Sequence, residues 1–493
     1  MNASSVSPYA RWVAVILLGG TVFRLWYSTH LELVGDEAYY WLWSRHPDIC
    51  YLDKGPVIAW LIWIGTALFG QTVFGIRFFA VLLASGTGVG IYLLARKLFS
   101  EKVAFWSVVL AAVTPLFAVG AALMTIDTVY IFFWTFAALA FWRAKDEEKF
   151  RWWILTGILV GFSMLSKYTG AIELVSFAAF CLWYPPGRRH FRRPTIYVML
   201  LVAALFLVPV LVWNWHHGFP TSQFLVHRGA LDERARIRPL EVLSFLGQQA
   251  GVISPLLFIG LLVALCWPRF AQTPKVETGY VISLFLPLFL VYLLLSFQKA
   301  SQANWAAASY VGGLILVAAK WTRALEVVPK LRWLVIAGVG LAVLETAILH
   351  ETSWLHLPGR LDPLDRARGS RDLAAQMHEL QIRTGARFVI ANKYMTAALL
   401  SFYLPDQPAT FMPVSSPPFN QIVLWPTYRV QHPADDAIFI TDVNRVPASV
   451  REDFPVIESA GEIRTTEAGR GVARYDVFLC RRPESSAAAN SSR

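Results

Sequence analysis

Long apolar segments recur along the first 350 residues of this chain, and they restrict its fold more than any other feature. A helix needs about 20 mostly apolar residues to cross the hydrocarbon core of a bilayer. Charged residues make up only 16% of the chain, whereas soluble domains carry about 25%. We therefore predict an all-α polytopic membrane domain with about eleven spans, at 12–28, 76–95, 103–121, 126–142, 152–166, 170–184, 195–213, 249–267, 278–297, 303–319 and 333–350.

Basic residues divide unevenly between the loops that join these segments. Seventeen Lys and Arg fall within 48 residues of one alternate set, at 96–102, 143–151, 185–194, 267–275 and 320–332, against 9 in 102 residues of the opposite set. By the positive-inside rule, the first set and the N-terminus face the cytoplasm of a bacterial-type inner membrane. The net charge of +11 then reflects orientation, and we expect no nucleic-acid partner. The apolar stretch 56–70 is too short for a comfortable span and is predicted to lie along the outer interface or re-enter it.

The composition changes near residue 355, where polar residues become frequent. Short apolar runs at 387–391, 437–441 and 475–480 indicate strands, and 371–382 and 395–403 have helical spacing. We predict three parts: a transmembrane domain over 1–354 with an outward first loop at 29–75, an extracytoplasmic α/β domain over 355–483, and a disordered tail over 484–493.

Acidic and basic side chains concentrate in the loops assigned to the outer face. The first loop contains GDEAYY from Gly35 and YLDKGP from Tyr51, and later loops contain MTID and SKYTG. Their charged members are Asp36, Glu37, Lys54, Asp127 and Lys167. Charged groups near a bilayer are costly unless they line a polar cavity, so these motifs are candidates for a functional site.

These residue types suit transfer from a lipid phosphate to a hydroxyl or amine. Lys54 and Lys167 would stabilise the phosphate, and Asp36, with Glu37 as a neighbour or substitute, would accept the proton of the acceptor. Asp127 would orient the acceptor or help to hold a divalent cation. Structural explanations also fit: acidic residues at helix N-termini, an N-cap, and lysines that reach the interface.

The stretch 35–100, together with Asp127 and the 166–170 motif, resembles the family 39 glycosyltransferases. These are bacterial relatives of the dolichyl-phosphate-mannose protein mannosyltransferases, and lipid A aminoarabinose transferases are similar. The family often has Asp-His-Pro-Pro or Glu-Lys-Pro where this chain has Asp53-Lys54-Gly55-Pro56. The resemblance implies a C-type glycosyltransferase fold, with interfacial helices in the outward first loop and a soluble outer domain.

The same resemblance implies an activity and its participants. A sugar would move from a polyprenyl-phosphate donor, usually with inversion, to a protein, lipid or glycan acceptor at the outer face, among membrane lipids. Catalytic acidic residues would fall on Asp36 and Asp127, and contacts to the donor phosphate on Lys54, Lys167 and Arg228. A secondary transporter and a lipid-linked glycan polymerase or ligase remain alternatives.

Overall fold

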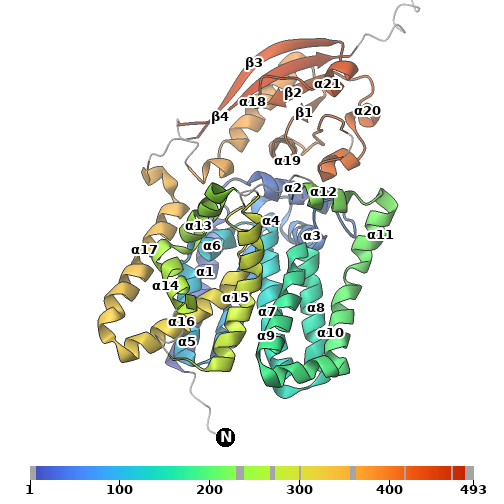
Figure 1. Cartoon of the computed structure of the whole chain (residues 1–493). Helices are drawn as coiled ribbons and strands as arrows, with labels where there is room; N and C mark the ends of the chain where they lie inside the picture. Colours follow the sequence, from blue (N-terminus) through green and yellow to red (C-terminus); the bar gives the residue numbers. More distant parts are fainter. Residues whose placement is uncertain are drawn as a thin grey trace, which may run out of the picture. The chain divides into compact units, whose positions relative to one another are not determined.

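The computed structural model describes residues 7–228, 238–266, 272–298, 301–355, 362–415, 418–467 and 470–482. The predicted disordered tail, 484–493, lies outside these residues. The chain divides into two compact units (Figure 1). The first comprises Met1–Ser28, Asp48–Cys50 and Lys54–Glu351, and the second comprises Thr29–Pro47, Tyr51–Asp53 and Thr352–Arg493.

The described part of the first unit is helical. Its helices are α1 (Pro8–Tyr27), α3 (Val57–Phe69), α4 (Val73–Leu98), α5 (Glu101–Val113), α6 (Pro115–Ala118), α7 (Ile126–Glu147), α8 (Phe150–Ser166), α9 (Ile172–Trp183), α10 (Pro194–Leu205), α11 (Val208–His217), α12 (Pro220–Arg228), α13 (Pro239–Ile253), α14 (Pro255–Cys266), α15 (Lys275–Leu295), α16 (Ser309–Val327) and α17 (Arg332–His350). Each segment predicted to span the membrane coincides with one of these helices or with a consecutive pair.

Four helices among the described residues are long and apolar enough to cross a membrane: Val73–Leu98, Pro194–His217, Lys275–Leu295 and Pro329–His350. Two predicted spans are instead bent helix pairs, with a bend of 77° between α5 and α6 and of 110° between α13 and α14. Both bends immediately precede a proline, Pro115 and Pro255, whose ring disfavours helical geometry in the residue before it. The total of eleven spans stays a prediction.

The segment 56–70 forms the short helix α3 and ends at Gly70, which has φ +76°. Its 13 residues extend about 20 Å, less than the hydrocarbon thickness of about 30 Å. The helix packs closely on α4, because a Cβ on Gly65 would lie 2.2 Å from the carbonyl oxygen of Gly75. Its predicted interfacial position remains a prediction.

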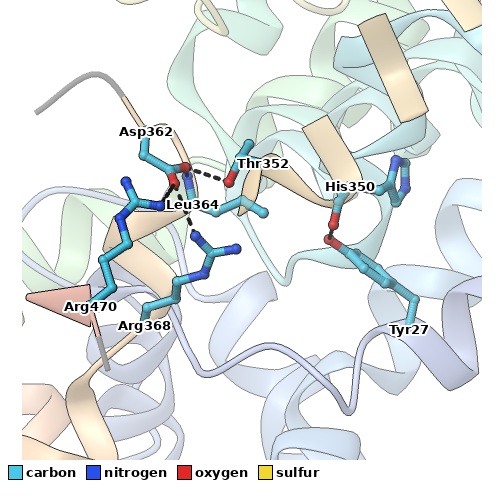
Figure 2. A network of polar contacts seen from close by, with 7 residues as sticks. All are labelled: Tyr27, His350, Thr352, Asp362, Leu364, Arg368 and Arg470. Atoms are coloured by element: carbon cyan, nitrogen blue, oxygen red, sulfur yellow. Dashed lines mark hydrogen bonds and ion pairs between the residues drawn. The ribbon is translucent and has the colours of Figure 1, made fainter. Parts of the chain in front are cut away.

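The helices of the first unit enclose an apolar core. Helix α7 packs against α4 and α8, α8 against α10, and α15 against α9 and α16 (Figure 1). The rings of Phe141 and Phe177 stack at 4.0 Å, and the Tyr280 hydroxyl donates to the Ala138 carbonyl at 2.6 Å. Near the ends of α1 and α17, the Tyr27 hydroxyl donates to the His350 carbonyl at 2.7 Å (Figure 2).

The second unit is an α/β domain with one four-stranded sheet in the order β1-β2-β4-β3. Strands β1 and β2 are parallel, and the other neighbouring strands are antiparallel. Its elements are α2 (Gly35–Arg45), α18 (Ser370–Thr384), β1 (Phe388–Ala391), α19 (Tyr394–Tyr403), α20 (Tyr428–Gln431), β2 (Ala437–Thr441), α21 (Ala448–Asp453), β3 (Val456–Glu467) and β4 (Arg470–Arg481).

The sheet confirms the predicted α/β architecture of the tail. The predicted strands correspond to β1, β2 and part of β4, and the predicted helices correspond to α18 and α19. Strand β3 was missed because Val456–Glu467 has no continuous apolar run and lies at the sheet edge with a register shift beside Gly461.

A buried carboxylate ties the first part of this domain to its sheet (Figure 2). Asp362 accepts hydrogen bonds from Thr352 Oγ1 at 2.6 Å and Leu364 N–H at 3.0 Å, and it pairs with Arg368 at 3.0 Å and Arg470 of β4 at 3.4 Å. Burial alone would raise the pKa of Asp362, but the hydrogen bonds and the two arginine charges outweigh it, so this pKa lies below its usual value.

Candidate functional site

The first unit brings Asp127 and Lys167 together in a buried ion pair. Asp127 lies in the first turn of α7, where the positive end of the helix dipole favours a carboxylate. Lys167 follows the last residue of α8 in an extended conformation. Its Nζ lies 2.8 Å from Asp127 Oδ1, and each side chain is only 10% exposed. Two residues that are 40 positions apart thus form one charged site.

The second oxygen of Asp127 also has a partner. Asn304, in the segment before α16, donates a hydrogen bond from Nδ2 to Asp127 Oδ2. This segment is held in turn by Gln249, whose Nε2 donates to the Ala303 carbonyl at 3.1 Å and whose Oε1 accepts from Tyr310 at 2.8 Å. Asn304 was not predicted, and the only signal for it in the sequence is that the polar residues Ser301, Gln302 and Asn304 cluster before an apolar helix.

The Lys54 segment packs beside the segment that contains Lys167. A Cβ on Gly55 would lie 2.0 Å from the carbonyl oxygen of Leu165, so only glycine permits this approach. The Cys50 thiol lies 3.5 Å from the Tyr168 hydroxyl. This packing is the physical reason for glycine at position 55, and together with the ion pair of Asp127 and Lys167 it gathers three predicted motifs in one part of the unit.

The Lys54 side chain is half-buried and lies against an aromatic ring. Its Nζ is 5.6 Å from the ring centroid of Phe224 in α12, which is within the range of a cation–π interaction. Helix α12 joins α11 by a tight turn in which the Thr221 N–H donates to Asn214 Oδ1 at 3.2 Å. Arg228 is the last residue of α12, and its side chain lies outside the described part of the structure.

Asp36 and Glu37 lie in the first turn of α2, in the second unit. Asp36 is half-buried, and its Oδ1 accepts a hydrogen bond from the Tyr394 hydroxyl at 3.0 Å. Glu37 is fully buried, and its Oε2 accepts from the Val34 N–H at 3.1 Å. The two adjacent carboxylates therefore have different surroundings, and Glu37 caps its own helix. Tyr394 was not predicted, because no local pattern marks it.

The surroundings of Asp36 are rigid and aromatic. The Tyr39 and Tyr394 rings lie 4.6 Å apart, and the Tyr39 hydroxyl accepts the Gln421 N–H at 2.7 Å. Burial raises the pKa of Tyr39 well above its ordinary value, and the charge of Asp53 adds to this effect, so the hydroxyl stays protonated. Among the described residues, no three His, Cys, Asp or Glu side chains gather as a metal site.

Comparison with known proteins connects this arrangement to sugar transfer. The family described as dolichyl-phosphate-mannose-protein mannosyltransferase matches residues 53–213, which include Lys54, Asp127 and Lys167. The lipid A galacturonosyltransferase RgtD of Rhizobium johnstonii is 27% identical over 404 residues, which cover 80% of this chain and 82% of that protein. The undecaprenyl phosphate-alpha-4-amino-4-deoxy-L-arabinose arabinosyl transferase of Pseudomonas aeruginosa is 26% identical over 40% of this chain and 39% of its own length.

Solved structures show the same fold. Crystal structures of ArnT from Cupriavidus metallidurans, in the apo state and bound to undecaprenyl phosphate, superpose with TM-scores of 0.65 and 0.62 at 16% identity. They cover 96% and 95% of this chain and 98% of each ArnT chain. The chain is a multi-pass membrane glycosyltransferase, as predicted. The family match and these relatives agree with the resemblance to family 39 glycosyltransferases that the first-loop motifs indicate.

Proposed function

We propose that this chain transfers a sugar from a polyprenyl-phosphate donor to a lipid A-type acceptor at the outer face of a bacterial inner membrane. The relatives support both substrates: one is named as a lipid A transferase and another as a transferase using an undecaprenyl-phosphate sugar. The structural relative bound to undecaprenyl phosphate supports the same donor class. A panel of donors would identify the sugar, and a panel of acceptors would test proteins and other glycans beside lipid A.

The buried pair of Lys167 and Asp127 carries this proposal. An ion pair with side chains only 10% exposed is costly to build inside a helical membrane protein, and such groups usually serve function. Asp127 accepts hydrogen bonds through both of its oxygens, from Lys167 and Asn304. We assign Asp127 the role of orienting the Lys167 ammonium, and Lys167 the role of stabilising the donor phosphate.

Lys54 is assigned the second contact to the donor phosphate. Its ammonium lies over the Phe224 ring, and an ammonium binds a phosphate as a point charge. Gly55 holds the preceding lysine at the Leu165 backbone. Arg228 stays a proposed further contact, on the evidence of the sequence alone.

Asp36 is assigned the role of general base. In a single displacement, its carboxylate accepts the proton of the acceptor hydroxyl while the hydroxyl oxygen bonds to the anomeric carbon. The bond from that carbon to the phosphate oxygen breaks, and polyprenyl phosphate leaves with the electron pair. Attack opposite the leaving phosphate inverts the anomeric centre. Glu37 is assigned a structural role because its carboxylate caps α2.

The test uses the purified full chain in nanodiscs with lipid A and labelled undecaprenyl-phosphate sugars, namely galacturonic acid, aminoarabinose and mannose. We expect transfer from at least one donor, and an Asp36→Asn variant that is about 10²- to 10⁴-fold slower. The matched control is Glu32→Gln, which alters a carboxylate of the same loop that accepts the Ser370 N–H. A wild-type protein that consumes no lipid-phosphate sugar would overturn the proposal, and a fully active Asp36→Asn variant would remove Asp36 from the mechanism.

The proposed orientation has its own test. In a Cys266→Ser background, which removes the exposed native thiol, a His30→Cys variant should react with an impermeant maleimide added to intact spheroplasts. Labelling only after membrane disruption would place the first loop in the cytoplasm and contradict the outer-face assignment.

A further inference from the structure

The first-loop segment Thr29–Pro47 is built into the C-terminal α/β domain. It belongs to the same compact unit as Thr352–Arg493, although more than 300 residues separate the two in sequence. Glu32 caps the N-terminus of α18 by accepting the Ser370 N–H at 2.6 Å and the Arg371 N–H at 3.3 Å. A side chain of the first loop thus satisfies backbone donors of a helix in the tail.

Helix α2 packs directly on α19, the helix that follows β1. A Cβ on Gly35 would lie 2.4 Å from Met395 Cβ, so the two helices approach as closely as a glycine allows. The Leu33 N–H donates to the Tyr403 hydroxyl at 2.7 Å, and the Trp41 and Phe402 rings meet edge-on at 5.0 Å. These contacts hold α2 along the length of α19.

This packing places the Tyr394 hydroxyl on the carboxylate of Asp36. Tyr394 is the first residue of α19, and its hydroxyl donates to Asp36 Oδ1 at 3.0 Å. The Tyr394 ring lies 4.6 Å from that of Tyr39, one turn further along α2, and Tyr39 is held by the Gln421 N–H. The phenol therefore has a defined position from which to orient the carboxylate.

We propose that Tyr394 is a positioning residue for Asp36, so that the C-terminal domain contributes directly to catalysis. This inference rests on the proposed function, in which Asp36 is the general base. The Tyr394 hydroxyl donates its hydrogen bond to Oδ1, which directs Oδ2 to the acceptor hydroxyl. The geometry converts a carboxylate with several rotamers into one with a fixed orientation, and orientation contributes strongly to rate.

The test replaces single hydroxyl groups in the full-length protein. Tyr394→Phe removes the hydrogen bond to Asp36 and keeps the aromatic ring beside Tyr39. Tyr403→Phe is the matched control, because it removes a hydroxyl from the same helix and the same interface, at Leu33 instead of Asp36. We expect Tyr394→Phe to lower kcat by about 10- to 100-fold with the donor KM changed less than about twofold. Tyr403→Phe should keep kcat within about threefold of wild type.

A second measurement separates positioning from folding. In an Asp36→Asn background, the further change Tyr394→Phe should leave the residual rate unaltered, because the two residues act as one unit. Additive losses would overturn the proposal, and so would a wild-type kcat for Tyr394→Phe or equal losses in both phenylalanine variants. If wild-type protein transfers sugar and Asp36→Asn does not, the proposed function stands even when this inference fails.

Discussion

Breaking the buried pair of Lys167 and Asp127 offers a quantitative test of the membrane part of the site. Asp127→Asn removes one charge and leaves the Lys167 ammonium in a site where its side chain is 10% exposed. With Nζ and Oδ1 separated by 2.8 Å, the direct attraction is about 6 kcal/mol at an effective dielectric constant of about 20. The desolvation of both groups offsets part of this, and loss of one partner of a buried pair costs about 3–5 kcal/mol.

The assay is the apparent Tm of the full chain in nanodiscs, measured beside sugar transfer. A loss of about 3–5 kcal/mol should lower the Tm by roughly 3–5 °C for Asp127→Asn or Lys167→Met, because the unfolding entropy of a chain of 493 residues is about 1 kcal/mol/K. The double variant removes both charges and should recover most of this stability, yet it should stay inactive because the ammonium is absent. The control is Lys149→Met, which breaks an exposed pair with Glu147 at 3.0 Å and should cost less than about 1 kcal/mol.

Two results would refute this reasoning. Single variants that melt within about 1 °C of the wild type would show that the pair contributes no net stability. A double variant that recovers transfer together with stability would show that the pair is a structural element and that Lys167 does not contact the donor.

Two further predictions concern packing and pH. Gly55→Ala should lower the free energy of unfolding by more than the usual overpacking cost of about 1–3 kcal/mol, because the new Cβ would lie 2.0 Å from the Leu165 carbonyl oxygen. Both the folded yield and the rate of transfer should therefore fall. The control is Gly120→Ala, which has open space and should be neutral. Asp362→Asn should destabilise the C-terminal domain by roughly 1–3 kcal/mol at pH 7. Since its folded pKa is depressed, the stability that the Asp362 carboxylate contributes is present above its unfolded pKa of about 3.9 and is lost as the pH falls through the folded value. Thermal melts followed by circular dichroism should therefore show a difference in Tm between wild type and Asp362→Asn that narrows below about pH 4. Equal Tm values at pH 7 would contradict the role of this network. A normal yield of active Gly55→Ala protein would contradict the packing argument.

The division of the chain into units places part of the first loop in the C-terminal domain. The loop was predicted as an outward part of the transmembrane domain over 1–354, whereas its segment Thr29–Pro47 is compact with Thr352–Arg493. The acidic motif at Asp36 therefore shares a folded body with the tail. Deleting the tail should unfold this segment and abolish transfer, so such a deletion cannot by itself locate the chemistry.

Local patterns in the sequence were sufficient for the membrane class, the helices of the long apolar segments, α18, α19, three of the four strands and the charged motifs. Apolar runs and alternating apolar positions depend on neighbours along the chain, and burial of those positions is what forms the elements. The same information was not sufficient for the bends before Pro115 and Pro255, because a long apolar window conceals a single backbone break.

Which side chains pair with one another was decided only by the tertiary structure. Asn304 meets Asp127 across 177 residues, and Tyr394 meets Asp36 across 358. Tyr394 carries no local signal and Asn304 only a weak one, because a hydrogen bond of about 3 Å depends on how whole helices pack and not on the composition around each residue. Residue types and membrane character can be read from the order of amino acids, whereas the contact of Tyr394 with Asp36 and the occupation of both Asp127 oxygens arise from packing between distant segments.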